Sequence, residues 1–317
     1  MALTASPRHR VLVTGAGGFV GGRLAVCLAA TGHDVHGVLR PGGRADAPAG
    51  AEPHVVDLTD ADAVRRLVRD VRPDWVFHLA ARVTGDRRLE AAGALVLENL
   101  AQTVHVVTAL AHTGCTRVVI AGSMEEPGRG EPATATPSSP YAAAKWASSG
   151  VARLGHALYG VPAVVARLSM VYGPGQRDTT KLVPLVITSL LRGKSPPLSS
   201  GARAVDWVHV DDVTRGLEAM AVTPGLEGRT VELGSGRLVT IREVVERIFG
   251  LMGVAESPRW GALPDRPLER PIVADVAGSR ALIGWAPQVT LERGLADTIA
   301  WYRDPGRSLV PGDGSVR

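Results

Sequence analysis

The chain has little cysteine and few aromatic residues, and both shortages narrow the kinds of protein that it can encode. Only two of its 317 residues are cysteine, and 4% are aromatic. Cys27 and Cys115 lie in apolar segments with no metal-ligand spacing around them. We therefore predict reduced core thiols and no metal site, and we exclude a disulfide-stapled secreted domain.

Long apolar runs and blocks of like charge are also missing. No uncharged apolar run reaches the roughly 18 residues of a membrane span, and the first ten residues lack the apolar stretch of a secretory leader. The 35 basic and 31 acidic residues leave a net charge of +4, with the arginines scattered along the chain. We therefore expect a cytoplasmic protein that has neither a nucleic acid nor a membrane as its partner.

What the sequence does contain is an alternation of strand-like and helix-like segments. Short apolar strands are expected at 10–14, 34–39, 75–79, 117–121 and 163–168. Helical segments separate them, including a long one over about 88–113 and one that starts with Ser139 as its N-cap and Pro140 as its first residue. This alternation predicts an α/β fold with a Rossmann-type, doubly wound parallel sheet.

The alternation breaks down after about residue 170, where helical pieces are joined by segments that contain proline and glycine. We expect a nucleotide-binding Rossmann domain over residues 1–169. A smaller, loop-rich lobe is expected mainly over 170–303, with some of its segments returning to the sheet. Residues 304–317 have little apolar surface to bury and are predicted to form a flexible tail.

A glycine-rich turn joins the first expected strand to the first expected helix. Gly15, Gly18 and Gly21 form the pattern G-x-x-G-x-x-G. Glycine lets the backbone approach a pyrophosphate, and the helix that follows supplies free N–H groups and the positive end of its dipole. In this strand–turn–helix setting, the turn predicts nucleotide binding rather than close helix–sheet packing alone.

The glycine spacing resembles that of the short-chain dehydrogenase/reductase superfamily, and other motifs resemble its extended subfamily of nucleotide-sugar epimerases, dehydratases and reductases. Tyr141 and Lys145 match the Tyr-x-x-x-Lys pair, and segments 171–174 and 206–212 match later motifs. The resemblance runs from about residue 9 to residue 303. It implies an NAD(P)-dependent enzyme that acts on a nucleotide-diphosphate sugar and forms a homodimer through the helices near 90–113 and 140–158.

Tyr141 and Lys145 are the catalytic pair that this resemblance implies. They lie one helical turn apart, so both project from the same helix face. A nearby ammonium lowers the pKa of a phenol from about 10, which makes Tyr141 a usable acid or base on a carbinol or carbonyl.

The segment after the fourth strand departs from the family pattern. Met124 occupies the place of the usual catalytic hydroxyl, so we expect Ser123 to contact the substrate oxygen, the alternative being a protein without that hydroxyl. Glu125 and Glu126 lie where sugar dehydratases carry their acid and base. The alternative for both is a pair of solvated loop carboxylates.

The resemblance implies a set of cofactor-binding residues that extends from the glycine turn to the fifth strand. They are Gly15, Gly18, Phe19, Val20, Gly21, Arg40, Asp57, Leu58, Leu79, Ala80, Ala81, Tyr141, Lys145 and Leu168. NAD-specific folds place an acidic residue at the end of the second strand, whereas this chain has Arg40 there, which suits a 2′-phosphate. We therefore expect NADP(H), with NAD(H) and a merely solvated arginine as the alternative.

Substrate contacts are expected mainly from the second lobe, with two from the segment after the fourth strand. They are Ser123, Met124, Met170, Lys181, Leu182, Arg203, Arg266 and Arg270. Met170 replaces an asparagine that commonly touches the pyrophosphate in this family, so a smaller substrate is the alternative. The favoured reaction is NADPH-dependent 4-ketoreduction of a nucleotide-linked keto-deoxysugar. The alternatives are an epimerase or dehydratase with tightly held NAD, and a non-catalytic nucleotide sensor.

Overall fold

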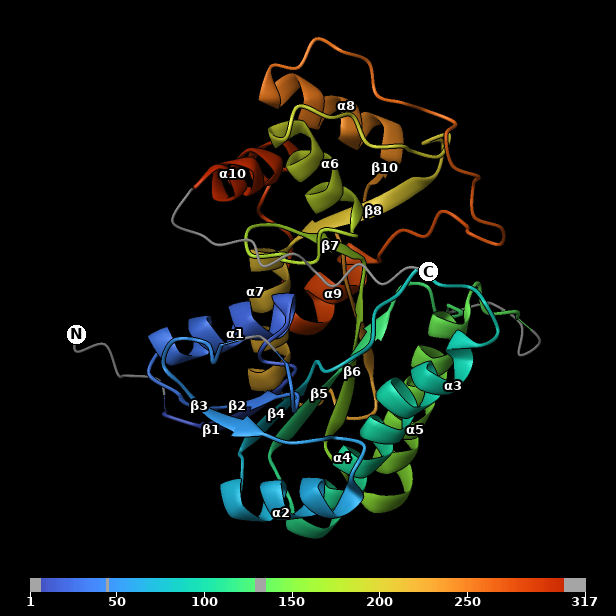
Figure 1. Ribbon diagram of the computed structural model, residues 1–317. Helices are drawn as coiled ribbons and strands as arrows, with labels where there is room; N and C mark the ends of the chain where they lie inside the picture. The colour runs from blue at the N-terminus through green and yellow to red at the C-terminus, as the bar shows by residue number, and fades with distance from the viewer. Residues whose placement is uncertain (1–6, 44–45, 129–134, 305–317) are drawn as a thin grey trace. The chain divides into compact units, whose positions relative to one another are not determined.

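The computed structural model describes residues 7–43, 46–128 and 135–304 (Figure 1). The chain folds into two compact and interleaved units. The first comprises Met1–Arg167, Thr214–Val231 and Leu282–Gly284, and the second comprises Leu168–Val213, Glu232–Ala281 and Trp285–Arg317. The domain limits inferred from the sequence remain predictions, and the expected tail lies, apart from Asp304, outside the described residues.

A seven-stranded sheet with the order β3-β2-β1-β4-β5-β6-β9 forms the centre of the fold. Its strands are β1 (Arg10–Thr14), β2 (Asp34–Leu39), β3 (Ala51–Val55), β4 (Trp75–His78), β5 (Arg117–Ser123), β6 (Ala163–Leu168) and β9 (Thr230–Leu233). The pairs β1–β2, β1–β4, β2–β3 and β4–β5 are parallel. The strand order reverses between β1 and β4, and ligands of such sheets bind at the carboxyl ends of the strands at this switch point.

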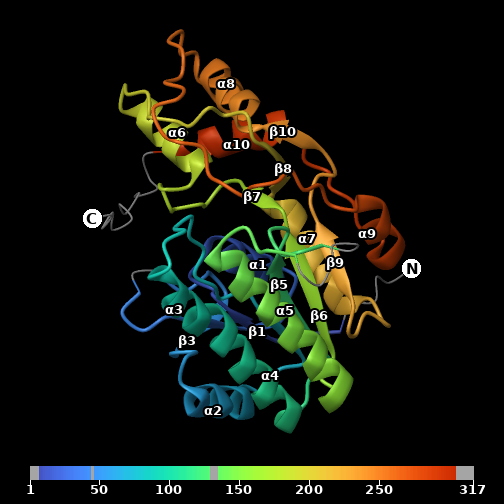
Figure 2. The same cartoon turned by 90° about the vertical axis from the view of Figure 1, so that its right-hand side faces the viewer.

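Helices cover both faces of this sheet (Figures 1 and 2). They are α1 (Phe19–Ala30), α2 (Ala61–Val71), α3 (Ala91–Leu95), the π-helical turn η1 (Val96–Ala101), α4 (Gln102–Thr113) and α5 (Pro140–Tyr159). One hydrophobic cluster joins strand residues such as Leu12 and Val76 to Leu67 of α2 and Leu110 of α4. The doubly wound α/β fold predicted from the sequence is confirmed.

Local sequence signals account for where several helices begin. Ser139 caps α5 by accepting a hydrogen bond from the N–H of Ala142, and Pro140 is the first helical residue, as predicted. Asp60 caps α2 in the same way. Strand β3 was not expected, because its residues are mostly polar or exposed, as an edge strand permits. Both cysteines are free, but they are only partly buried.

The segment Ala91–Thr113 is, by length and composition, the one described helix that could cross a membrane. It contains η1 in its middle, and its residues contact α2 and α5 within the first unit. A single such helix is weak evidence for a span, because packed helices of α/β domains pass the same test.

The second unit has its own sheet and core. Strands β7 (Met170–Tyr172), β8 (Ala204–His209) and β10 (Leu238–Thr240) form a sheet of order β10-β8-β7, in which β8 is antiparallel to β10 and parallel to β7. Its helices are α6 (Leu182–Leu191), α8 (Ile241–Met252) and α10 (Leu291–Arg303), while α7 (Val210–Val222) and α9 (Val276–Ile283) belong to both units. Tyr172, Trp207, Ile248 and Leu295 are among its buried core residues.

Candidate active site

The glycine turn after β1 has no room for side chains at two of its three motif glycines. Gly15 has a φ of +71°, and a Cβ there would lie 2.8 Å from the backbone nitrogen of Ala80. A Cβ on Gly21 would lie 2.3 Å from the carbonyl oxygen of Gly15. Gly18, which precedes α1, is exposed, and no side chain caps the helix there. The turn therefore leaves bare backbone and a helix N-terminus for an anionic group.

A buried hydrogen-bond network ties this turn to the end of β4. The Thr14 hydroxyl accepts hydrogen bonds from the N–H groups of Leu79 and Ala80, both at 3.1 Å, and lies 2.9 Å from Nδ1 of His78. Nε2 of His78 lies 3.2 Å from the Thr103 hydroxyl, which itself donates to the carbonyl of Asn99.

This arrangement defines the protonation of His78. Because the Thr103 hydrogen is committed to Asn99, the His78 Nε2–H must donate to Thr103 and Nδ1 must accept from Thr14. Burial, with a smaller effect of Lys145, lowers the pKa of His78 to about 3, so the ring is neutral at physiological pH. The network holds the Leu79–Ala81 segment against the glycine turn, where the sequence predicts cofactor contacts.

Helix α5 carries the predicted catalytic pair. Lys145 is 4% exposed, and burial lowers the pKa of its ammonium to about 8 although the charge of Glu126 opposes that change. Burial raises the pKa of Tyr141, and the charges of Glu125 and Glu126 raise it further, while a hydrogen bond with the Ser123 side chain lowers it. The direction expected from the sequence is therefore wrong for Tyr141, because burial and two carboxylates dominate.

The loop after β5 turns its two glutamates in different directions. The Glu126 carboxylate accepts a hydrogen bond from the Ser123 N–H at 2.6 Å, and its side chain is buried at 3% exposure. Burial raises the pKa of Glu126, while Ser149, the Ser123 N–H, Lys145 and Arg167 oppose the increase. Glu126 thus occupies the interior between β5 and α5.

Glu125 is partly buried in the same loop, next to Ser123, the buried last residue of β5. The Ser123 hydroxyl accepts a hydrogen bond from the Glu125 N–H at 3.1 Å, and the Glu125 carboxylate accepts one from the Ser139 hydroxyl at 3.5 Å. Met124, in the usual place of the catalytic hydroxyl, is 6% exposed. Ser123, Glu125 and Tyr141 therefore form a group of proton-carrying side chains next to Lys145.

Arg167 of β6 holds the backbone of this loop in place. Its guanidinium donates to the carbonyl oxygens of Ser123, Met124 and Glu126 at 3.1, 3.3 and 2.5 Å. Hydrogen bonds from a charged donor are stronger than those between neutral groups, so the buried guanidinium fixes the backbone of the loop. The role of Arg167 depends on contacts across more than 40 positions, so the sequence alone does not predict it.

The end of β2 presents exposed side chains. Arg40 forms an ion pair with Glu98 of η1 at 3.2 Å, and Glu98 also pairs with Arg82 at 2.8 Å. Asp57 binds the backbone and hydroxyl of Thr59, which lowers its pKa, with Arg40 a smaller contribution. The Leu58 side chain points into the core instead.

Of the six substrate residues predicted in the second unit, three are exposed and three are partly buried. Lys181 precedes α6 and lies 3.8 Å from Asp178, with Leu182 as the first helical residue. Arg203 and Arg266 share Glu269, at 2.9 and 3.7 Å, and Arg270 is exposed. Within the same unit, Met170 begins β7 and Leu168 ends β6.

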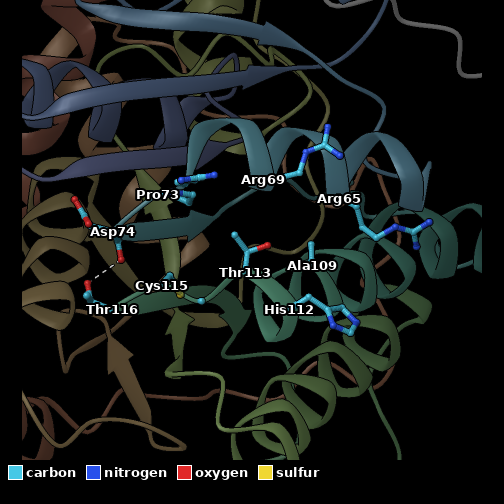
Figure 3. A pocket seen from close by; sticks show the side chains of 11 residues that line it. Arg65, Arg69, Pro73, Asp74, Ala109, His112, Thr113, Cys115 and Thr116 are labelled. Atoms are coloured by element: carbon cyan, nitrogen blue, oxygen red, sulfur yellow. Dashed lines mark hydrogen bonds between the residues drawn. The ribbon is translucent and has the colours of Figure 1, made fainter.

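A pocket outside this site lies between the C-terminal ends of α2 and α4 (Figure 3). Arg65 and Arg69 line it from α2, and His112 lines it from α4. Asp74 and Thr116 come just before β4 and β5, so the pocket lies at the amino end of strands whose carboxyl ends meet the glycine turn. It is not the cofactor site.

The fold and these residues define a dinucleotide-binding α/β enzyme with a tyrosine–lysine pair. Residues 11–234 match the model of the NAD dependent epimerase/dehydratase family. A dTDP-glucose 4,6-dehydratase of Actinoplanes sp. is 33% identical over 93% of this chain and 98% of that protein. A second, from Streptomyces griseus, is 33% identical over 95% and 97%.

Two solved structures show the same likeness. UDP-glucose 4-epimerase of Thermus thermophilus in complex with NAD matches with a TM-score of 0.82 and 29% identity, covering 93% of this chain and 99% of that one. The dTDP-glucose 4,6-dehydratase of Streptomyces venezuelae with NAD bound matches with a TM-score of 0.80 and 30% identity, covering 93% and 97%. The chain belongs to the NAD-dependent epimerase/dehydratase family of extended short-chain dehydrogenases/reductases.

Proposed function

We propose that the chain is an NAD-dependent nucleotide-sugar dehydratase of the 4,6-dehydratase type. The group formed by Ser123, Glu125 and Tyr141 at the end of β5 carries this proposal, because dehydration needs a further acid or base besides the tyrosine. The named relatives support dehydration or epimerisation and lend no support to the ketoreductase expected from the sequence.

The nicotinamide cofactor fits the turn between β1 and α1. The absence of side chains at Gly15, Gly18 and Gly21 opens the backbone to a pyrophosphate, and Phe19 and Val20 supply N–H groups of the first helical turn. Asp57, Leu58 and the segment Leu79–Ala81 would border the adenosine and nicotinamide parts, with Leu168 as a further candidate. When bound there, NAD would supply reversible hydride transfer to and from the sugar.

Each residue of the catalytic group has a proposed role. In its phenolate form Tyr141 takes the proton of the sugar hydroxyl that is oxidised, and Ser123 orients that oxygen in place of the residue that Met124 has replaced. Lys145 holds the cofactor ribose and supplies positive charge. Glu125 moves a proton during the loss of water.

Glu126 is proposed as a positioning residue. Its carboxylate is committed to the Ser123 N–H and is buried between β5 and α5, so it sets the position of Ser123 rather than reaching a sugar ring. Its charge also favours the ammonium form of Lys145. The proposed roles therefore differ: Glu125 transfers a proton and Glu126 positions Ser123, although the sequence motif gives no reason to distinguish them.

We infer that NAD, rather than NADP, is the cofactor. The relatives with bound cofactor hold NAD. Arg40, on which the expectation of NADP rested, already pairs with Glu98, so its charge is partly neutralised. A dehydratase also restores its cofactor in each turnover and needs no supply of NADPH.

We further propose that the substrate is a nucleotide-diphosphate sugar. The second unit offers Lys181, Arg203, Arg266 and Arg270 as candidate contacts for its phosphates, and Met170 and Leu182 are further candidate contacts. Assembly as a homodimer and a cytoplasmic location remain proposals of the same standing.

Incubation of the purified protein with dTDP-glucose and UDP-glucose, without added reductant, tests the proposal. A dehydratase yields a product lighter by one water in mass spectrometry, whereas an epimerase yields an isomer of equal mass. A ketoreductase leaves both sugars unchanged and oxidises NADPH only when a keto sugar is supplied. Either of the last two outcomes overturns the proposal.

The variants Glu125→Gln and Glu126→Gln form a matched pair for the proposed roles. Glu125→Gln should lower the rate of water loss by about 10²-fold or more, the range for a lost general acid or base, with NAD binding retained. Glu126→Gln should keep more activity but lower the melting temperature. The reverse pattern would exchange the two assignments.

A further inference from the structure

Two histidines and a glutamate meet on neighbouring strands at the edge of the main sheet. His36 lies on β2, and Glu52 and His54 lie on the edge strand β3. The strand register places His36 directly opposite Glu52 and Val38 opposite His54. Because side chains alternate along a strand, positions 52 and 54 lie on one face of β3. The register therefore brings three metal-ligating side chains together.

The distances among their ligating atoms fit a single metal ion. Nδ1 of His36 lies 2.9 Å from Nε2 of His54 and 3.5 Å from a carboxylate oxygen of Glu52. The three groups offer atoms that all lie within 4.8 Å of one another. Ligands held tetrahedrally at about 2.0–2.2 Å from zinc are separated by roughly 3.3–3.6 Å. The two separations from His36, 2.9 and 3.5 Å, lie close to this range, and the third is no more than 4.8 Å, so side-chain rotations can close it.

The second ring nitrogen of His36 points to the same conclusion. His36 is 8% exposed, and its Nε2 is a buried atom that has no hydrogen-bond partner among the described residues. A carboxylate oxygen of Asp34 lies 3.7 Å from it. A histidine that binds metal through one nitrogen usually donates its other N–H to a carboxylate. Asp34 is close enough to become that acceptor, and its carboxylate already accepts a hydrogen bond from Arg10 Nε at 3.1 Å.

We propose that His36 Nδ1, His54 Nε2 and a Glu52 carboxylate oxygen bind one divalent transition-metal ion of the Zn²⁺ type. Two imidazoles and a carboxylate suit such an ion, and water completes the fourth position. On binding, the hydrogen between the two rings moves to Nδ1 of His54, so two neutral imidazoles face the metal.

The proposed metal site is separate from the active site and lies at the edge of the main sheet. Asp34 and His36 lie in the amino-terminal half of β2, whereas the cofactor edge lies at its carboxyl end near Arg40. The metal would link the edge strand β3 to β2. An edge strand whose residues are mostly exposed gains most from such a link, because few buried contacts hold it.

Isothermal titration of tag-free, EDTA-treated protein with ZnCl₂ tests the proposal, with CoCl₂ absorbance as a report on ligand geometry. Wild-type protein should take up one equivalent of either metal. Glu52→Gln and His54→Gln should weaken binding by at least about 100-fold, and Asp34→Asn by roughly 10–100-fold, as for other outer partners of ligating histidines. Because Glu52 is exposed, its variant should fold normally.

His112→Gln is the matched control, since it removes an exposed histidine outside the cluster. It should bind zinc like the wild type. Amide hydrogen exchange in residues 51–55 should slow on addition of zinc in the wild type and in His112→Gln, but not in Glu52→Gln. No uptake by the wild type, binding that survives both ligand substitutions, or unchanged exchange in β3 would overturn the proposal.

Discussion

The two sides of the cofactor edge hold their polar groups in different ways. On the β5–α5 side, Glu126 and Lys145 are buried, and Arg167 is fixed by three backbone carbonyls. On the β2–β3 side, Arg40 and Asp57 are exposed, and their contacts are with Glu98 and with Thr59. Removing one partner of a buried hydrogen bond lowers the free energy of unfolding by about 1–3 kcal/mol, whereas an exposed ion pair contributes about 0–1 kcal/mol to it. The effects of substitution should therefore decrease from the first side to the second.

The largest effect is expected for Tyr141→Phe. This variant keeps the ring but loses the hydroxyl that hydrogen bonds to Ser123. Turnover should fall by about 10²–10⁴-fold, the range for loss of a general acid or base, while NAD affinity stays near that of the wild type. Steady-state kinetics and NAD titration measure both quantities. Near-normal turnover would mean that another group carries the proton.

Gly21→Ala should come next, because the added Cβ would lie 2.3 Å from the Gly15 carbonyl oxygen, where backbone must move. NAD affinity should fall by more than about 10-fold, with a loss of roughly 1–3 kcal/mol in the free energy of unfolding, as for other overpacked sites. Gly93→Ala in α3 is the control, since a Cβ there meets nothing within 4 Å. Equal behaviour of the two variants would contradict the proposed role of the turn.

Lys145→Met should separate activity from stability. Burial lowers the pKa of Lys145 from 10.5 to about 8, so holding its charge below pH 8 costs stability. The variant should lose turnover, yet its free energy of unfolding at pH 7 should rise by about 1–3 kcal/mol.

The pH dependence of this gain follows from proton linkage. Between pH 8 and 10.5 the unfolded wild-type chain binds more protons at Lys145 than the folded one, so the wild type gains stability as the pH rises. The advantage of Lys145→Met should shrink over that window. Urea unfolding at several pH values provides the measurement, and a variant less stable than the wild type at pH 7 would refute the expectation.

The smallest effect is expected for Arg40→Ala, whose side chain is 76% exposed. NAD affinity should change by less than about fivefold, as for an exposed ion pair. Titration of NAD and NADP into both proteins tests this. The opposite result would be a wild type that binds NADP more tightly than NAD and an Arg40→Ala variant in which NADP affinity falls by about 10–150-fold. Arg40 would then determine cofactor choice, and a reductase would become the better proposal.

Features that depend on neighbouring residues could be predicted from the sequence. The cap formed by Ser139 and Pro140, the glycine turn and the alternation that builds the parallel sheet all follow from local patterns and from backbone sterics. The same holds for Tyr141 and Lys145, because a spacing of four residues on a helix defines their shared face.

The burial of the site could not be read in this way. Glu125 and Glu126 are adjacent in the sequence, and only the packing of β5 against α5 and the contact with Arg167 separate an interior carboxylate from a more accessible one. The pKa of Tyr141 depends on the same packing. The cluster of His36 and His54 likewise results from strand register, which a search for closely spaced ligands does not detect.

The π-helical turn η1 decides how the helix Ala91–Thr113 responds to the loss of a residue. Its wider winding contains Glu98, which binds two arginines, and Asn99, which binds the N–H of Arg82 at 2.8 Å and its carbonyl at 3.2 Å. Deleting one residue from 96–101 would let this stretch wind as an α-helix with little rotation of its flanks, because six π-helical residues turn through about the same angle as five α-helical ones. It would, however, break the contacts of Glu98 and Asn99. A deletion in α4 would instead turn the preceding segment by about 100° and bring the fully buried Leu95 towards water. The packing of this long apolar helix should therefore tolerate the loss of a residue best in η1, a difference that its apolar sequence pattern does not predict.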